Sequence, residues 1–293
     1  MINRVTNQGL MITAQRNLQQ SLSALAQKQN DAGTLVRINR PSDDPAGTVD
    51  SIRVRSAQAA TTQFARNISD GNAWLTTVDT ALSTSTDIMA RVRDLTVQGA
   101  NDGAMSPLQK EAIAVELESL RAELLKTANT SYLGRSVFAG NSDAGVAFTD
   151  DLAFTGTGST VERRIGTDVA IRVDADGAAT FGVGDDSVFA LVDNIITDLR
   201  SGVNVGTRLT EIDTKVATIL GQQGAVGARQ AQVLKTQGAN VTESVSLEAQ
   251  RAEIEDLDLG QAIIDLKAQE LNYQAALSVT SRALQQTLMD FLR

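Results

Sequence analysis

The feature that most constrains the fold is a heptad pattern of apolar side chains that runs to the C-terminus. From residue 259 the apolar positions recur at alternating steps of three and four, which places them in one narrow stripe along a helix. A second apolar line lies beside the first, so we expect contacts with more than one neighbouring helix. The stripe consists of Leu259, Ile263, Leu266, Glu270, Tyr273, Leu277, Thr280, Leu284, Leu288 and Phe291, and the second line of Leu257, Ile264 and Leu271.

A shorter stripe of the same kind lies near the N-terminus. Leu18, Leu22 and Leu25 follow the same steps of three and four, and Gly33 ends the pattern. Burying such a stripe does not by itself offset the backbone entropy that is lost when a long helix becomes ordered. We therefore expect the terminal helices to need partners.

The region between the two ends also shows mainly helical spacing. Apolar steps of three and four predict helices over residues 64–92, 113–124, 188–199 and 209–219. Two glycines and a proline between 99 and 107 predict the turn after the first of these helices. The series over 64–92 spans four heptads, which is far longer than an average globular helix.

One segment departs from helical spacing. Residues 137–187 are rich in Gly, Thr and Asp, and Val169, Ile171 and Val173 alternate before Asp176–Gly177. Alternation followed by an Asp-Gly pair is typical of a β-hairpin. The expected fold class is therefore mainly α with a β-rich insert, an α+β chain.

Composition excludes several classes of function. The net charge is −9 and aromatic residues make up 3%, which argues against a nucleic-acid-binding protein. The chain has no Cys and no His, so it cannot build a zinc site from those residues, a disulfide, or a Ser–His or Cys–His nucleophile. No apolar run is long enough to span a membrane, and the N-terminus lacks the apolar core of a secretory signal. We expect no membrane insertion.

The carboxylate clusters suggest no catalysis. Asp43–Asp44, Asp150–Asp151 and Asp185–Asp186 are adjacent pairs, which seldom converge on one substrate atom, so turn and cap roles are expected. The stretch "DADG" from Asp174 hints at a calcium loop but lacks its further acidic ligands. The stretch "EIEDLD" from Glu253 fits the start of a helix or a solvated face equally well. We predict no enzyme activity, no metal and no cofactor.

The stretch "NRPSDDPAG", residues 39–47, holds two of the three prolines in the chain. The residue before a proline avoids the helical region, so Asp44 can cap a helix whose first position is Pro45. Local chemistry alone fits an ordinary helix–helix loop, and the stretch can also be a firm joint. The residues assigned to the joint are Asn39, Arg40, Pro41, Ser42, Asp43, Asp44 and Pro45.

Six segments form a recognisable set: "RVTNQ", "INRPSDDPAG", "RVRDLTVQGAN", "NTSYLGRSVFAGN", "VGAR" and "YQAALSVTSRALQQTLMDFLR". They cover most of residues 1–141 and 223–293, and residues 142–187 match no known pattern. Together the segments resemble the flagellin superfamily. Within that family the resemblance is stronger to the branch that joins the hook to the filament, partly because of "YLGRSVFAG".

The resemblance implies three domains built from both halves of the chain. Residues 1–44 and 256–293 would pair as a terminal coiled-coil domain that forms an assembly interface. Residues 45–136 and 188–255 would form a helical trunk, and 137–187 a variable β-rich outer domain. The joint would then fix the direction in which the trunk leaves the terminal domain.

The resemblance also implies a function and partners. The chain would be an exported, extracellular component of the bacterial flagellum, secreted without a cleaved signal peptide, that forms the junction between hook and filament. The alternative is a flagellin that forms the filament itself. Expected partners are further copies of the chain in a ring, flagellin, the other junction protein on the hook side, and an export chaperone before secretion.

Two trunk residues carry a further implication of the resemblance. Arg91 and Leu95 fall on positions that face an innate immune receptor in some flagellins, although trunk packing is the favoured interpretation. The sequence also departs from the family pattern at Gln223, where relatives commonly carry an arginine. No salt bridge is therefore expected at that position.

Overall fold

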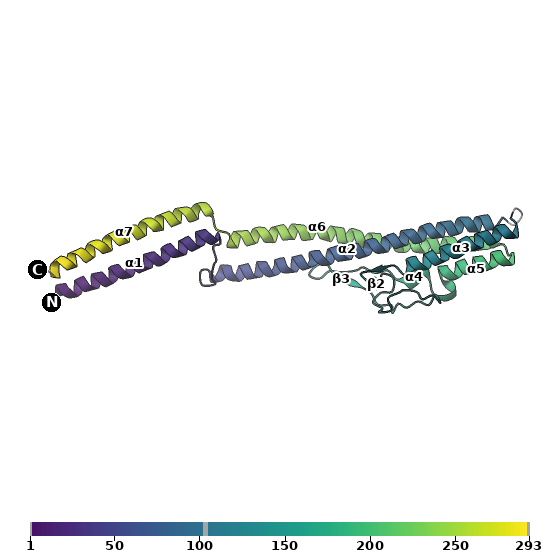
Figure 1. Ribbon diagram of the computed structural model, residues 1–293, viewed down its shortest axis with the longest axis horizontal. Helices are drawn as coiled ribbons and strands as arrows, with labels where there is room; N and C mark the ends of the chain where they lie inside the picture. Colours follow the sequence, from purple (N-terminus) through teal and green to yellow (C-terminus); the bar gives the residue numbers. More distant parts are fainter. Residues whose placement is uncertain (1, 102–104, 292–293) are drawn as a thin grey trace. The chain divides into compact units, whose positions relative to one another are not determined.

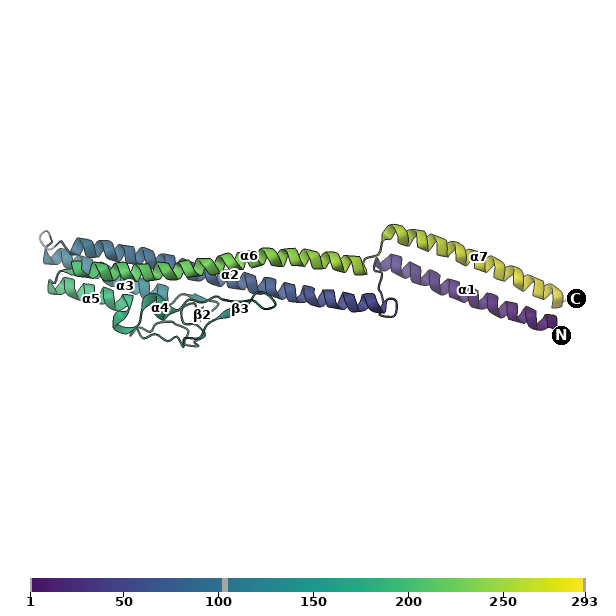
Figure 2. The same ribbon diagram turned by 180° about the vertical axis from the view of Figure 1, so that it is seen from behind.

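The computed structural model describes residues 2–101 and 105–291, with the side chains of residues 9, 11–101 and 105–282. The structure is mainly helical with two small sheets, as predicted (Figures 1 and 2). The four longest helices are α1 (Ile2–Thr34), α2 (Pro45–Gly99), α6 (Leu209–Glu255) and α7 (Leu259–Phe291).

The chain divides into two compact units. The terminal unit comprises Met1–Ala59 and Ser244–Arg293, and the trunk unit comprises Ala60–Glu243. Helices α2 and α6 contribute residues to both units. The division of the chain into three domains remains a prediction.

In the terminal unit α1 and α7 lie side by side and run in opposite directions (Figures 1 and 2). The Nε2 of Gln269 donates to the carbonyl of Ser21 at 3.1 Å, and Lys28 Nζ lies 3.2 Å from Asp265 Oδ2. The half-buried positions along α7 recur with heptad spacing, so the two helices meet along one seam. On α7 these positions include Ala262, Asp265, Leu266, Gln269, Glu270, Tyr273, Ala276 and Thr280, and on α1 they include Leu18, Ser21 and Leu25.

The predicted stripe on α7 only partly coincides with this seam. Four predicted stripe residues belong to the seam: Leu266, Glu270, Tyr273 and Thr280. Ile263 and Leu277 lie one position away from seam residues and stay 50% and 49% exposed. One position is a rotation of about 100° around a helix, and a single neighbouring helix covers only a narrow face. The predicted side chains that remain about half exposed are Leu22, Leu259, Ile263 and Leu277, while those of Leu284, Leu288 and Phe291 lie outside the described residues.

The trunk unit has a continuous apolar core. Helices α3 (Pro107–Ala128) and α5 (Val188–Ser201) add to α2 and α6, and Ser106 caps α3 in a capping box with Gln109. Helix α2 ends at Gly99 and α3 begins at Pro107, as the predicted turn requires, and Gly103 lies outside the described residues. Core residues include Ile68, Trp74, Leu75, Val78, Leu82, Met89 and Val92 from α2, and Ile212, Ile219, Val226 and Val233 from α6.

The insert between α3 and α5 holds both small sheets. Strands β1 (Ser131–Tyr132) and β2 (Arg135–Ser136) form one antiparallel pair, and β3 (Glu162–Arg164) and β4 (Ala170–Arg172) form the other. Five phenylalanines fill the space between the insert and α5, with ring centroids 5.1–6.0 Å apart. They are Phe138, Phe148, Phe154, Phe181 and Phe189.

The predicted hairpin turn at Asp176–Gly177 is wrong. Strand β4 does include Ile171, but its partner strand precedes it in the chain. Asp176 is instead the N-cap of the short helix α4 (Gly177–Phe181), because its Oδ1 accepts the backbone N–H of Ala178 at 2.9 Å. An Asp-Gly pair suits a helix start as well as a turn, and the sequence alone does not separate the two.

Candidate functional site

The stretch with two prolines follows a short segment, residues 35–37, that is hydrogen-bonded to the connection between α6 and α7. Leu35 ends α1 in the left-handed conformation, with φ +57°, and its N–H reaches the Asp31 carbonyl at 3.0 Å. The two connecting segments then pair: Arg37 N–H donates to the Glu255 carbonyl at 2.8 Å, and Leu257 N–H donates to the Leu35 carbonyl at 3.1 Å. Both connections of the terminal helices are therefore fixed to each other.

The loop itself is closed by local hydrogen bonds. The Asp43 N–H donates to the Arg40 carbonyl at 2.9 Å, a β-turn with Pro41 in the position that suits its fixed φ. The Asp43 carboxylate accepts the Arg40 N–H at 2.8 Å. Asn39 Nδ2 donates to Asp31 Oδ1 at 3.0 Å and so ties the loop back to α1.

The predicted cap on α2 is confirmed. Asp44 Oδ1 accepts the N–H of Gly47 at 2.8 Å, and Pro45 is the first residue of the helix. Gly47 leaves room for this cap, since a Cβ would lie 2.5 Å from Asp44 Oδ2 and 2.7 Å from Ile38 Cδ1, and both side chains would have to move. Arg37 adds an ion pair to Asp44 at 3.6 Å. The capped start gives α2 a defined first turn.

Glu255 connects the segments around the joint. The sequence predicted a helix start or a solvated face for its stretch, residues 253–258, and both are wrong at Glu255, because α6 ends at this residue and its side chain is buried. Its side chain is only 4% exposed. Arg55 on α2 binds both carboxylate oxygens, each at 2.7 Å, Ser51 donates to the same group, and Arg251 approaches at 3.3 Å. The Glu255 carboxylate thus links the last turn of α6 to the start of α2. The backbone carbonyl of the same residue accepts a hydrogen bond from the segment after α1.

The ion pairs around Glu255 change the pKa values of the groups that form them. The hydrogen bonds from Arg55 are the largest cause that lowers the pKa of Glu255 to about 2, and burial acts in the opposite direction. The pKa of Arg55 is raised by the same contact. Glu255 is therefore ionised at neutral pH. The one available signal was an acidic residue in the last turn of a helix, where the dipole disfavours it and a cationic partner is expected.

The two trunk residues with a receptor-like position differ in exposure. Arg91 is half exposed and pairs with Glu116 at 2.6 Å. Leu95 is 2% exposed and packs in the core of the trunk unit. Gln223, the departure from the family pattern, donates through Nε2 to Asp79 on α2 at 3.2 Å. The receptor interpretation, which stays untested, can concern only Arg91 as a surface residue.

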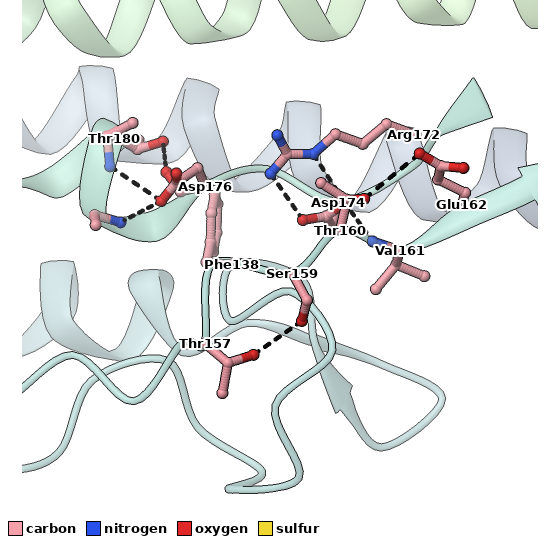
Figure 3. A network of polar contacts seen from close by, with 12 residues as sticks. Phe138, Thr157, Ser159, Thr160, Val161, Glu162, Arg172, Asp174, Asp176 and Thr180 are labelled. Atoms are coloured by element: carbon pink, nitrogen blue, oxygen red, sulfur yellow. Dashed lines mark hydrogen bonds and ion pairs between the residues drawn. The ribbon is translucent and has the colours of Figure 1, made fainter.

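A second polar network lies within the insert around Asp174 (Figure 3), and Arg229 fastens it to the trunk. Asp174 is fully buried and accepts hydrogen bonds from the Val161 N–H at 2.8 Å and from Arg172 at 2.9 and 3.0 Å. Arg229 on α6 donates to the carbonyl of Asp174 at 2.7 Å and to that of Arg172 at 3.3 Å. Burial lowers the pKa of Arg229, and the charge of Arg172 acts in the same direction.

This network is structural rather than metal-binding in its chemistry. The Asp174 carboxylate is already satisfied by protein donors, and Asp176 caps α4. Among the residues that the structure describes, no group of three or more acidic side chains is placed to hold a metal ion. No helix in the described part of the chain has the length and apolar character needed to cross a membrane.

The fold and the joint define a helical protein whose two chain ends pair with each other and are tied together again at the base of the pair. The family model for the bacterial flagellin N-terminal helical region matches residues 5–143, and that for the C-terminal helical region matches residues 209–292. Together these cover most of the chain. The chain therefore belongs to the bacterial flagellin superfamily, a family of structural flagellar proteins.

Individual proteins show the same likeness in sequence and in fold. The chain is 26% identical to the flagellar filament 33 kDa core protein of Treponema phagedenis over 290 residues, which is 96% of each chain. Among solved structures, FlgL of Bacillus cereus matches with TM-score 0.61 and 21% identity, over 68% of this chain and 99% of that one. The flagellar junction protein FlgL of Legionella pneumophila matches with TM-score 0.59 and 16% identity, over 71% and 100%.

Proposed function

We propose that this chain is the adaptor that forms the junction between hook-side proteins and the flagellin filament. The observation that carries the proposal is the fold likeness to FlgL chains, one of them described as a junction protein, along 99–100% of their own length. The "YLGRSVFAG" segment supports the same choice. In this role the chain binds further copies of itself in a ring, with flagellin on one side and the hook-side junction protein on the other.

The incompletely covered terminal pair supports an assembly role. Leu22, Leu259, Ile263 and Leu277 are each about half exposed in the free chain. Covering the exposed half of one such side chain is worth about 1 kcal/mol, and four of them together give a useful driving force for association. In the proposal neighbouring copies cover this apolar flank, which is why the terminal stripes serve as the assembly interface.

The joint supplies the second element of the proposal. Residues 39–45, together with the contacts of Glu255 to Arg37 before them and to Ser51 and Arg55 after them, fix the direction in which α2 leaves the terminal pair. A fixed direction lets many identical copies repeat the same contact, as a closed ring or a filament requires. The three-domain organisation, with residues 137–187 as an outer domain, follows from the same proposal.

The export route is also part of the proposal. The chain is secreted without a cleaved signal peptide and acts outside the cell on the flagellum. A dedicated chaperone shields the exposed apolar flank of α7 before secretion. Failure of a peptide of residues 256–293 to bind any flagellar export chaperone would count against this part.

Seeded assembly tests the proposal. Purified chain is mixed with isolated hook structures or filament fragments and followed by light scattering and electron microscopy. Binding to the ends without elongation supports the junction adaptor. A chain that lacks residues 256–293 should keep a folded trunk and fail to bind, and normal binding of that truncation would reject the assembly role.

The second candidate is a flagellin that forms the filament. It is favoured by the match to the Treponema phagedenis filament core protein along 96% of both chains. Growth of long filaments from this chain alone, in the same seeded experiment, would establish that function and overturn the adaptor.

A further inference from the structure

The tip of the first β-hairpin carries a residue that its turn does not favour. Ser131 pairs with Ser136 and Tyr132 with Arg135, so Leu133 and Gly134 form a two-residue loop. Both have positive φ, +50° and +78°, as a type I′ turn requires. Gly134 suits this conformation, but the position before it favours Asn, Asp or Gly. A leucine there is strained.

Two other leucines with positive φ have local explanations, and Leu133 does not. Leu152 packs against the apolar core. Leu35 ends α1, and its carbonyl accepts a hydrogen bond in the joint. Leu133 is 81% exposed. No contact within the described residues of the single chain accounts for the strained backbone at Leu133, and strained residues are concentrated at functional sites. This indicates a role for Leu133 in contact with another molecule.

The base of the hairpin holds this tip firmly outward. The ring of Tyr132 lies 5.4 Å from that of Trp74, which is buried in the trunk core. On the other strand Ser136 and Val137 are buried, and Val137 N–H donates to the Thr130 carbonyl at 3.0 Å. A two-residue turn on such a base cannot fold back, so the leucine is presented to the surroundings.

We propose that Leu133 is an apolar contact residue that inserts into a neighbouring copy of this chain during assembly. Burial of one leucine strengthens an interaction only about ten- to a hundredfold. A soluble complex of micromolar affinity needs an association constant of about a million per molar. A lone side chain therefore cannot recruit a separate partner. It is effective where other contacts already hold the two molecules together, as between copies in an assembly. The inference therefore rests on the proposed assembly function.

The test compares Leu133→Asn with Leu108→Asn, because both leucines are 81% exposed in the trunk unit. Asn is favoured in the left-handed turn position, so L133N should melt at or above the temperature of the parent chain. It should nevertheless bind hook or filament ends at least tenfold less well in the seeded experiment. L108N should bind like the parent. Equal binding by L133N, equal losses in both variants, or a lower melting temperature of L133N would overturn the proposal.

Cross-linking identifies the neighbour directly. The chain has no cysteine, so a benzophenone attached to Leu133→Cys labels one site. Irradiation of assembled samples should give a covalent dimer of this chain, and irradiation of the free chain should not. A cross-link to flagellin or to a hook-side protein would reject the neighbouring copy as the partner. If the parent chain itself fails to bind seeds, the proposed function fails first, and the inference falls with it.

Discussion

The two units of this protein use the same apolar periodicity with very different degrees of burial. In the trunk unit Leu75, Leu82 and Val92 of α2 are fully buried, because α3, α5 and α6 cover that helix from several sides. In the terminal unit Leu259 and Leu277 stay about half exposed, because α1 packs along one face of α7 and these side chains lie beside that face in the described part of the chain. The trunk completes its core within one chain, whereas the terminal pair leaves an apolar flank exposed.

The largest effect is expected from the buried Asp174 carboxylate, which holds the part of the insert that Arg229 binds. Asp174→Asn leaves Arg172 and Arg229 close together without their shared anion, which should destabilise the trunk unit by about 3–5 kcal/mol. Trp74 is the only tryptophan and lies in that unit, so its fluorescence during urea unfolding measures the change. Asp185→Asn, at an exposed position, is the control and should change little. Equal stability of the two variants would show that Asp174 is not a structural anchor.

A core truncation in the trunk should come next. Leu82→Ala removes a fully buried side chain, and the cost should be about 2–5 kcal/mol. The Trp74 transition should shift accordingly. A loss below about 1 kcal/mol would mean that the trunk core is no better packed than the terminal pair, and the comparison would fail.

The joint should give an intermediate effect that is confined to the terminal unit. Glu255→Gln places an amide against Arg55 and Arg251 and should cost about 1–3 kcal/mol. Helix content followed by circular dichroism should fall at a lower temperature, while the Trp74 transition stays in place. A parallel shift of both signals would show that the two units do not respond separately.

The same carboxylate makes a pH prediction. The pKa of Glu255 is lowered to about 2 in the folded chain, below its unfolded value of about 4.5, so its contribution to stability is present above pH 4.5. That contribution is lost as the pH falls from about 4.5 towards 2. The stability difference between the parent chain and E255Q should therefore shrink over this range in denaturation series. A difference that is constant with pH would contradict the assigned ion pairs.

The smallest effect on the free chain is expected on the apolar flank. Leu277→Ala removes a side chain that is already 49% exposed, so the free chain should lose less than about 1 kcal/mol. Its binding to seeds should nevertheless weaken. A variant as unstable as L82A, or one that assembles normally, would break the contrast between the two units.

The elements that depend on local information were predictable from the sequence. The spacing of Ile68, Leu75 and Leu82 gives the long helix α2 directly, because periodicity encodes the buried face. The Asp44–Pro45 cap followed from the conformational limits that proline imposes on its neighbours. Both are properties of a few adjacent residues or of a repeated step.

The features that depend on distant contacts were not predictable. Ser51 and Arg55 lie about two hundred residues from Glu255 in the chain, so no local pattern joins them. The capping role of Asp176 was hidden because Asp-Gly serves helix starts and turns alike. Heptad spacing placed Ile263 and Leu266 in one stripe, but only the position of α1 decides which of them enters the seam.

Hydrogen–deuterium exchange on the free and the assembled chain tests the central claim most directly. The account predicts that amides of α1 and α7 exchange much faster than those of α2 in the trunk unit when the chain is free. On binding to hook or filament ends the terminal amides should become protected, while the trunk core changes little. Terminal helices that are already as protected as the trunk in the free chain, or that gain no protection on assembly, would contradict the account.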